Sequence, residues 1–211
     1  MLYFDILDKK RLLLLPRLSF LREYNFYLAG GTGLALQLGH RISIDFDFYR
    51  QEPFEPQKIF QEFQEKFAQD NLRQIQIDKG TLTIRVNNIG ISLFRYRYPL
   101  VRPLIKTEHA DLASFEDIGA MKIIAVMQRG IKRDFVDIYF LLENLSLKQL
   151  LDLAEKKYKG FNKYLALQGL LYFKDADTDK ALKMLKPISW HKVKKEIITK
   201  VNAFKKLTLK Q

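Results

Sequence analysis

Hydrophobic and polar residues change their spacing about halfway along the chain. Up to about residue 100, segments that are apolar at every second position alternate with segments of helical spacing, and beyond that point only helical spacing recurs. The strand segments, one short and apolar and the rest alternating, are 26–29, 42–49, 73–78, 81–86 and 89–96. The turn signals "DKG" and "NNIG" separate the last three of these, which predicts an antiparallel meander.

Helical spacing predicts three helices in the first part of the chain and six in the second. The first three are 5–23, which has a weak point at Pro16, 32–39 and 55–69. The other six are 115–129, 132–144, 146–157, 161–173, 178–185 and 190–206. Thr32 is the expected N-cap of the helix over 32–39, and Gly39 is expected to end it.

A proline-bracketed connector, "YPLVRP" at 98–103, separates the two parts. We place a domain boundary just after it. The predicted fold class is therefore α+β, with an α/β domain over 1–105, in which helices flank a sheet, followed by a C-terminal helical bundle over 106–211.

Composition narrows the function without naming it. The chain has no cysteine, which excludes disulfides and thiolate metal sites and suits the cytoplasm, and we expect no membrane span or signal peptide. The net charge is +12, and residues 141–211 hold 16 lysines against seven acidic residues. Such a basic region favours a polyanion such as RNA, although a solvated lysine-rich helical face would have the same composition.

Two aspartates interrupt the apolar pattern of the strand predicted over 42–49. Side chains alternate between the faces of a strand, so Asp45 and Asp47 share one face, about 6.5–7 Å apart. Two carboxylates this close repel each other unless a cation joins them. Mg²⁺ prefers such oxygen ligands together with substrate phosphates. We therefore expect Asp45 and Asp47 to hold a catalytic metal.

The glycine pair that precedes this strand supplies the other half of a candidate site. Gly30 and Gly31 permit close backbone approach, and the helix that follows directs N–H groups and a positive dipole end toward a ligand, which suits phosphate. Thr32 could add a hydroxyl. His40 and Arg41 lie in the turn before the aspartates, where Arg41 could contact a nucleotide phosphate, whereas a histidine in that position is more often an ordinary loop residue.

The order of these features is similar to a known family signature. The stretches "LAGGTGLALQLGHRISIDFDFY" and "SFEDIGAMKIIAVMQRGIKRDFVDIYFLL" resemble the AbiEii/AbiGii-type nucleotidyltransferase toxins. The likeness covers 25–142 well and the last 70 residues poorly. It implies a nucleotidyltransferase-fold mixed sheet and Mg²⁺-dependent transfer of a nucleotide from an NTP to an acceptor hydroxyl. It also implies that the acceptor is RNA, notably a tRNA 3′ end, and that a cognate antitoxin opposes the activity.

The second stretch places four charged residues on two helices. Lys122 begins a helical stripe from which it could reach a triphosphate as a mobile point charge. Arg133, Asp134 and Asp137 follow on the next helix, where the resemblance implies that Asp134 is catalytic and that Arg133 and Asp137 bind the nucleotide. The carboxylates could orient Lys122 or an arginine, or could serve the acceptor hydroxyl. The plainer alternative is that Arg133 and Asp137 form only a helix-surface ion pair.

The sequence departs from the family pattern at one position. Active relatives commonly carry a third carboxylate on a later strand, but residues 79–107 contain neither Asp nor Glu, and Ser92 and Arg95 stand where it might lie. Asp78 is the nearest earlier candidate. Either Asp134 or Asp137 takes over, or the chain is a binding module with weakened turnover. The same segment holds six cations around Tyr96 and Tyr98, which would suit RNA or triphosphate or would only protect a sheet edge.

Overall fold

The computed structural model of the protein describes residues 2–208. The first part of the chain contributes two short 3₁₀ segments, three α-helices and five strands. In chain order they are η1 (Phe4–Ile6), α1 (Lys9–Arg17), η2 (Ser19–Tyr24), β1 (Tyr27–Leu28), α2 (Gly30–Leu38), β2 (Phe46–Arg50), α3 (Pro56–Lys66), β3 (Leu72–Asp78), β4 (Thr81–Val86) and β5 (Ile89–Arg95).

The five strands form one mixed sheet in the order β1-β2-β5-β4-β3. β3, β4 and β5 pair antiparallel in sequence, which confirms the predicted meander. β2 pairs parallel with β5, and in this register Asp47 lies opposite Ser92. The prediction of a sheet flanked by helices is confirmed.

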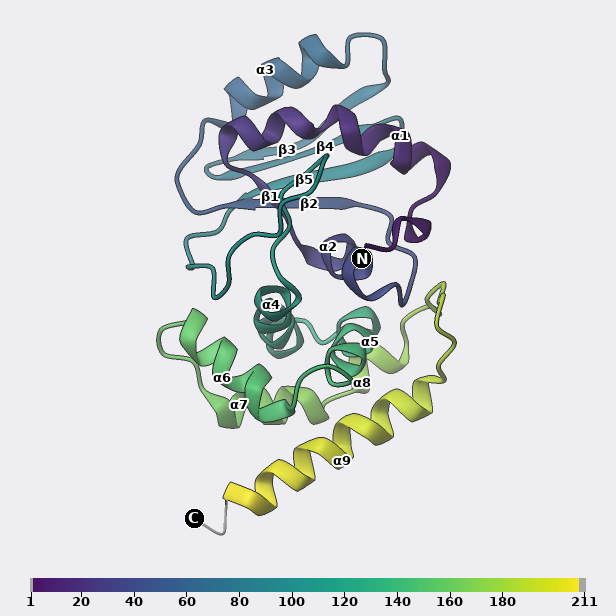
Figure 1. Ribbon diagram of the computed structural model, residues 1–211, viewed down its shortest axis with the longest axis vertical. Coiled ribbons are helices and arrows are strands. Elements are labelled where there is room, and N and C mark those ends of the chain that lie inside the picture. Colours follow the sequence, from purple (N-terminus) through teal and green to yellow (C-terminus); the bar gives the residue numbers. More distant parts are fainter. Residues whose placement is uncertain (1, 209–211) are drawn as a thin grey trace.

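The two faces of the sheet have different roles. Fully buried residues such as Phe46, Phe48 and Ile91 point to the face covered by α1 and α3, where they form one hydrophobic cluster. Because side chains alternate along a strand, Asp47 and Ser92 point to the other face. That face looks toward α2 and the helical part of the chain (Figure 1). The sheet therefore has its core on one side and the candidate chemistry on the other.

The second part of the chain is helical. It comprises α4 (Phe115–Gln128), α5 (Lys132–Leu141), α6 (Leu147–Lys157), α7 (Lys163–Leu171), the single turn α8 (Lys174–Asp177) and α9 (Trp190–Thr208). α4 is the central helix and packs against α5, α6 and α7. Within 2–208, no helix is both long enough and apolar enough to cross a bilayer. α2 joins the two parts, because Leu34 packs in the helical cluster while Ala35 and Leu36 pack in the sheet cluster.

Two predicted helical features in the first part of the chain differ from the structure, and a third agrees with it. The helix expected over 5–23 is broken into η1, α1 and η2, because α1 ends just after Pro16 and the amide of Leu18 turns to a tighter bond with the carbonyl of Leu15. Helix α2 begins at Gly30, so Thr32 lies inside its first turn and is not the N-cap. Gly39 ends α2 in the left-handed conformation, as predicted.

The helix expected over 178–185 does not form, because this segment bonds to the other part of the chain. We call residues 181–186 the strap. The amide of Ile42 donates to the carbonyl of Lys183, and the amides of Leu185 and Lys186 donate to the carbonyl of His40. Arg41 and Met184 form an antiparallel bridge. These bonds use backbone groups that a helix would need, so the strap is not helical, and Met184 is its one residue paired in a bridge.

Candidate active site

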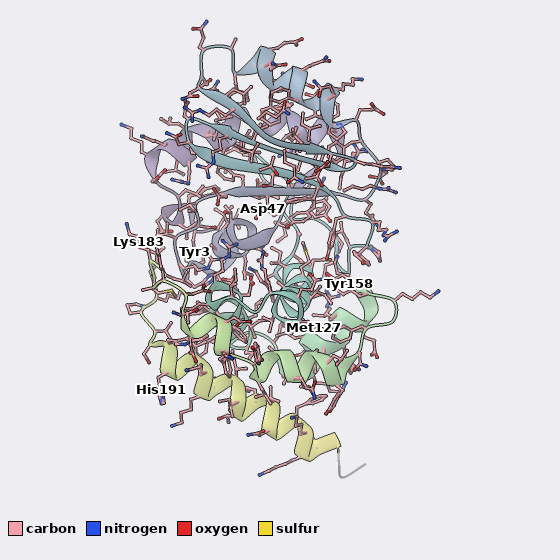
Figure 2. The ribbon with its side chains drawn as sticks, turned by 180° about the vertical axis from the view of Figure 1, so that it is seen from behind. Tyr3, Asp47, Met127, Tyr158, Lys183 and His191 are labelled. Carbon is pink, nitrogen blue, oxygen red and sulfur yellow. The ribbon has the colours of Figure 1, made fainter. Side chains whose placement is uncertain are left out.

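A cavity of about 850 Å³ lies between the open face of the sheet and the helical part of the chain. Figure 2 shows Asp47 on the sheet side, with Met127 of α4 and Tyr158, just after α6, below it and Lys183 to one side. The start of α2, the strands β2 and β5, helix α4, the α6–α7 loop and the strap all contribute to its lining. Both parts of the chain therefore build this one site.

The glycine pair at the start of α2 faces the carboxylates, as the sequence predicts. Gly30 has a φ of +58°, and a Cβ there would lie 2.7 Å from Oδ2 of Asp47. A Cβ on Gly31 would lie 2.6 Å from a guanidinium nitrogen of Arg41. No side chain caps this helix start. Gly30 is required by its positive φ and by Asp47, and a side chain at Gly31 would displace the Arg41 guanidinium. The first amides of α2 are left for a ligand.

Asp45 and Asp47 lie side by side on the cavity wall. The predicted strand over 42–49 starts only at Phe46, so Asp45 immediately precedes β2. Its carboxylate occupies the space that a side chain at Gly90 would fill, since a Cβ there would lie 2.6 Å from Oδ1 of Asp45. Thr32 fixes this segment, because its hydroxyl donates to the carbonyl of Asp45 and lies 2.8 Å from Oγ of Ser43.

Neither carboxylate of this pair has a cationic partner within 4 Å in the described part of the chain. Burial, and then the charge of Asp45, raise the pKa of Asp47 above its ordinary value, although Lys122 and Arg133 act in the opposite direction. The surrounding cations therefore offset only part of the cost of charging Asp47. The pair therefore suits an external cation.

The third carboxylate of the family pattern is not found beside this pair. Ser92 lies opposite Asp47, at the position in the sheet where such a residue would stand. Asp78 ends β3, the outermost strand, and β4 and β5 separate it from β2. Asp45 and Asp47 are the only acidic residues of the described chain that line the cavity, and no three metal-binding side chains cluster anywhere in 2–208.

Asp134 lies beneath the cavity and not in its lining. It is fully buried and accepts from Nζ of Lys122 at 2.9 Å and from the Arg129 guanidinium at 2.8 and 3.1 Å. Burial alone would raise the pKa of Asp134, but Lys122 and Arg129 lower it below its ordinary value. Lys122 and Arg129 themselves line the cavity, so this carboxylate fixes both cations at its wall.

Asp137 has the same place in the structure and more partners. It is fully buried and accepts from the Arg41 guanidinium at 2.7 and 2.9 Å, while Nε2 of His40 lies 2.8 Å away and Nζ of Lys122 lies 2.6 Å away. Burial would raise the pKa of Asp137, but these cations and the His40 hydrogen bond hold it well below its ordinary value. Burial, the largest effect, also lowers the pKa of His40, which is therefore neutral.

Arg133 is separate from this network. It is exposed, lines the cavity, and has no ion pair within 4 Å among residues 2–208. The surface pair of Arg133 with Asp137, which the spacing allowed, is thus not formed. Arg133 is close enough to lower the pKa of Asp47, so its charge acts on the open side of the site.

Sequence reasoning gave too little weight to two sets of residues. Lys157 and Asp117 form a fully buried ion pair of 2.8 Å, and both also bond to the backbone of the connector, at Pro99 and at Val101 and Arg102. The second set is a group of aromatic side chains in the cavity wall, of which the sequence singled out only Tyr96 and Tyr98. None of the six cations between 79 and 107 lines the cavity.

The family model described as nucleotidyl transferase AbiEii toxin, Type IV TA system, matches residues 14–207. The match runs through the C-terminal helices, beyond the two motifs that first indicated it. The uncharacterized protein aq_aa25 of Aquifex aeolicus strain VF5 is 38% identical over 159 residues, which cover 72% of this chain and 75% of that protein.

Solved structures show the same fold. A Helicobacter pylori protein provisionally described as a nucleotidyltransferase has a TM-score of 0.61 at 17% identity, and the match covers 97% of this chain and 99% of that chain. MenT4, the nucleotidyltransferase toxin Rv2826c of Mycobacterium tuberculosis H37Rv, has a TM-score of 0.58 at 17% identity, covering 90% of this chain and 80% of that chain. The expectation of a nucleotidyltransferase-type mixed sheet is confirmed.

Proposed function

This chain belongs to the AbiEii nucleotidyl transferase toxin family and is a nucleotidyltransferase, and from that premise we propose a specific reaction. The enzyme transfers an NMP from an NTP to an acceptor hydroxyl, with Mg²⁺ as the metal and the 3′ end of an RNA, such as tRNA, as the acceptor. A cognate antitoxin opposes it. Its substrates place the reaction in the cytoplasm.

One observation supports this proposal most directly. Asp45 and Asp47 lie next to each other at the uncapped start of α2, inside a cavity, and no cation of the described residues pairs with either of them within 4 Å. Two carboxylates held in this way fit a divalent cation, which prefers one or two carboxylates, water and substrate phosphates as ligands. When bound, the cation would supply positive charge for the phosphates and for the leaving group.

Other residues of the cavity bind the phosphates, position Asp45 and offset negative charge. The amides of Gly30 and Gly31 hold phosphate oxygens, and Thr32 keeps Asp45 in place through its backbone. Lys122 and Arg133 offset the charge that develops on the phosphates. The acceptor hydroxyl attacks the α-phosphorus in line, pyrophosphate leaves, and the hydroxyl proton is released to solvent.

We assign Asp134, Asp137 and Arg41 a positioning role in this scheme. Both aspartates are fully buried behind cations and neither lines the cavity. They hold Lys122 and Arg129 at the wall, and Asp137 holds Arg41 against Gly31. This replaces the direct catalytic or nucleotide-binding role that the motif suggested for Asp134 and Asp137.

The RNA acceptor is supported by charge. The chain carries a net charge of +12, and Arg133, Lys159 and Lys183, which line the cavity, form no ion pair within 2–208. Unpaired cations at the entrance of an active site attract polyanions through counterion release. They come from α5, from the α6–α7 loop and from the strap, so the helical part would bind most of the acceptor.

The decisive experiment incubates the protein with Mg²⁺, total RNA and each α-³²P-labelled NTP in turn. We expect one or more labelled RNA species, and we expect Asp45→Ala to reduce labelling at least about 1,000-fold while leaving the melting temperature nearly unchanged. Asp78→Ala is the matched control, because Asp78 is an exposed carboxylate at the far edge of the sheet. Full activity in Asp45→Ala would overturn the mechanism.

A second candidate function rests on Ser92, which stands where a third carboxylate would complete the site. In that case the protein is a nucleotidyltransferase-fold module that binds RNA or a protein with little turnover. The same experiment separates the two functions, since the module would bind RNA in a salt-sensitive way but transfer no label. Label that appears on an added protein in place of RNA would redirect the proposal to a protein hydroxyl.

A further inference from the structure

The cavity has two chemically different ends. At the polar end are the glycine turn of α2, the carboxylates Asp45 and Asp47, and the cations Lys122, Arg129 and Arg133. Another part of the wall, which we call the aromatic end, is lined by the rings of Tyr49, Phe94, Tyr96, Tyr98, Tyr158 and Phe161. The proposed reaction uses only the polar end.

The rings of the aromatic end contact one another in series. The centroids of Tyr49 and Phe94 are 5.4 Å apart, and those of Tyr49 and Tyr96 are also 5.4 Å apart. The series continues from Tyr96 to Tyr98 at 5.0 Å and from Tyr98 to Tyr158 at 4.7 Å. These distances lie within the range of favourable aromatic pairs, so the wall is a packed surface and not a set of separate side chains.

The wall remains uncharged around neutral pH. Burial, the largest effect, raises the pKa of Tyr96 to about 12 and also raises the pKa of Tyr49 and Tyr158. The hydroxyls of Tyr96 and Tyr158 hydrogen-bond to each other. This part of the cavity therefore presents mainly ring surface to a ligand.

The two ends follow each other along the same strands. Tyr49 is two residues after Asp47 on β2, so it shares the face of Asp47 at a distance of about 6.8 Å along the strand. Phe94 has the same relation to Ser92 on β5, which runs parallel to β2. A ligand that has its phosphates at the polar end and extends along these strands meets the rings one step later.

We propose that the aromatic end binds the base of the nucleotide whose phosphates lie at the polar end. The inference rests on the proposed function and adds a binding subsite to it. A base is joined to its α-phosphate through one ribose, which matches the two-residue step from Asp47 to Tyr49. The cavity volume of about 850 Å³ is in the upper part of the range of roughly 300–1,000 Å³ typical of small-ligand sites.

The chemistry of the wall also predicts how selective the subsite is. Stacking on aromatic rings is tolerant of base identity, because every base has a π-face. Since the Tyr96 and Tyr158 hydroxyls are bonded to each other, they contribute little base-specific recognition. We therefore expect ATP, GTP, CTP and UTP to bind with affinities within about tenfold of one another.

The test compares each NTP with inorganic triphosphate, which has the phosphates but no base. Dissociation constants are measured by calorimetry in the presence of Mg²⁺. The wild-type protein should bind NTPs at least about tenfold more tightly than triphosphate, given the usual contribution of one stacked base. Tyr98→Ala should weaken NTP binding about fivefold or more and leave triphosphate binding unchanged, whereas Tyr98→Phe, which keeps the ring, should restore NTP binding.

Tyr164→Ala is the matched control, because this tyrosine is 64% exposed on α7 and does not line the cavity. It should change neither affinity. Equal binding of NTPs and triphosphate by the wild type would refute the aromatic subsite and leave the proposed function intact. Failure of both ligands to bind would refute the proposed function and the subsite with it. If Tyr98→Ala weakened only RNA binding, the aromatic end would hold the acceptor, and the inference would be wrong.

Discussion

The protein contains two pairs of aspartates with closely similar spacing and opposite surroundings. Asp45 and Asp47 line the cavity and have no cationic partner in the described chain, and the pKa of Asp47 is raised. Asp134 and Asp137 are fully buried among lysine, arginine and histidine side chains, and their pKa values are lowered. Residue type alone therefore does not reveal a role, whereas the partners of each carboxylate do.

This difference shows that the site has two layers of carboxylates, one lining the cavity and one buried behind the lining. Asp134 and Asp137, the inner pair, form ion pairs with the protein's own cations, and these hold Lys122 in a fixed position at the cavity wall. Asp45 and Asp47 are the outer pair. The outer pair keeps its charge for a ligand. Buried ion pairs of the inner kind are weak evidence for net stability, because desolvation offsets much of the attraction, but removing one partner is costly. Their value in this protein is geometric.

The largest effect that separates the two pairs should be on stability. Asp137→Asn leaves Arg41 and Lys122 buried with too little negative charge, and we expect it to lower the free energy of unfolding by about 3–5 kcal/mol in urea titrations. Asp47→Asn removes a charge that no protein cation balances, so it should leave stability unchanged or raise it. Equal destabilisation by the two variants would break the comparison.

The pH dependence of stability should follow the inner pair at the acid end. The folded pKa values of Asp134 and Asp137 lie below the ordinary 3.8, so their contribution is complete above pH 3.8 and is lost as the pH falls below it. Each unit of pKa difference corresponds to about 1.4 kcal/mol. Urea titrations between pH 7 and pH 3 should show this loss, and Asp137→Asn should reduce it. A wild-type slope equal to that of the variant would contradict the assignment.

Mg²⁺ should act on the outer pair only. Binding to the folded state alone stabilises it by about 1.4 kcal/mol when the free metal is at ten times its Kd. We expect Mg²⁺ to raise the melting temperature of the wild-type protein and of Asp78→Asn, and to have no effect on Asp45→Asn. A shift of the same size in all three proteins would show that the metal binds elsewhere.

The smallest expected difference is in the stability of variants at Arg129 and Arg133, which both line the cavity. Arg129 is half exposed, and without it the buried Asp134 still pairs with Lys122, so Arg129→Met should cost no more than about 1 kcal/mol of stability. Arg133→Met removes no ion pair, and it should leave the free energy of unfolding within about 0.5 kcal/mol of wild type while weakening NTP binding. Loss of stability in Arg133→Met would show an undetected structural role for this residue.

Local sequence was sufficient to predict the sheet meander and most helices. The strands β3, β4 and β5 are joined by tight turns whose glycine and asparagine residues adopt positive φ, and Ser114 and Ser146 cap α4 and α6 through their own side chains. In each case the determining contacts lie within a few residues. The proximity of Gly30 and Asp47 could also be predicted locally, because the short helix α2 is the only helix between them and brings the two residues together in space.

Contacts between distant segments explain what was missed. Residues 42–45 alternate like a strand, yet the amide of Ile42 bonds to Lys183, more than a hundred residues away. Tyr158 and Tyr49 reach the same cavity from opposite parts of the chain, and nothing in the local pattern of either links them. For Asp137, the local spacing allowed only a surface pair with Arg133, whereas its actual partners Arg41 and Lys122 come from other elements.

The strap is synthesised late, and this matters for when the cavity can be completed. Residues 40–42, which carry Arg41 into the cavity, complete their backbone bonding only with residues 183–186. A ribosome translating this message makes the glycine turn and both outer carboxylates early, but the nascent chain lacks the piece that closes the margin of the pocket until most of it has been made. A prematurely released fragment would therefore carry the signature residues without the segment that completes the backbone bonding of residues 40–42.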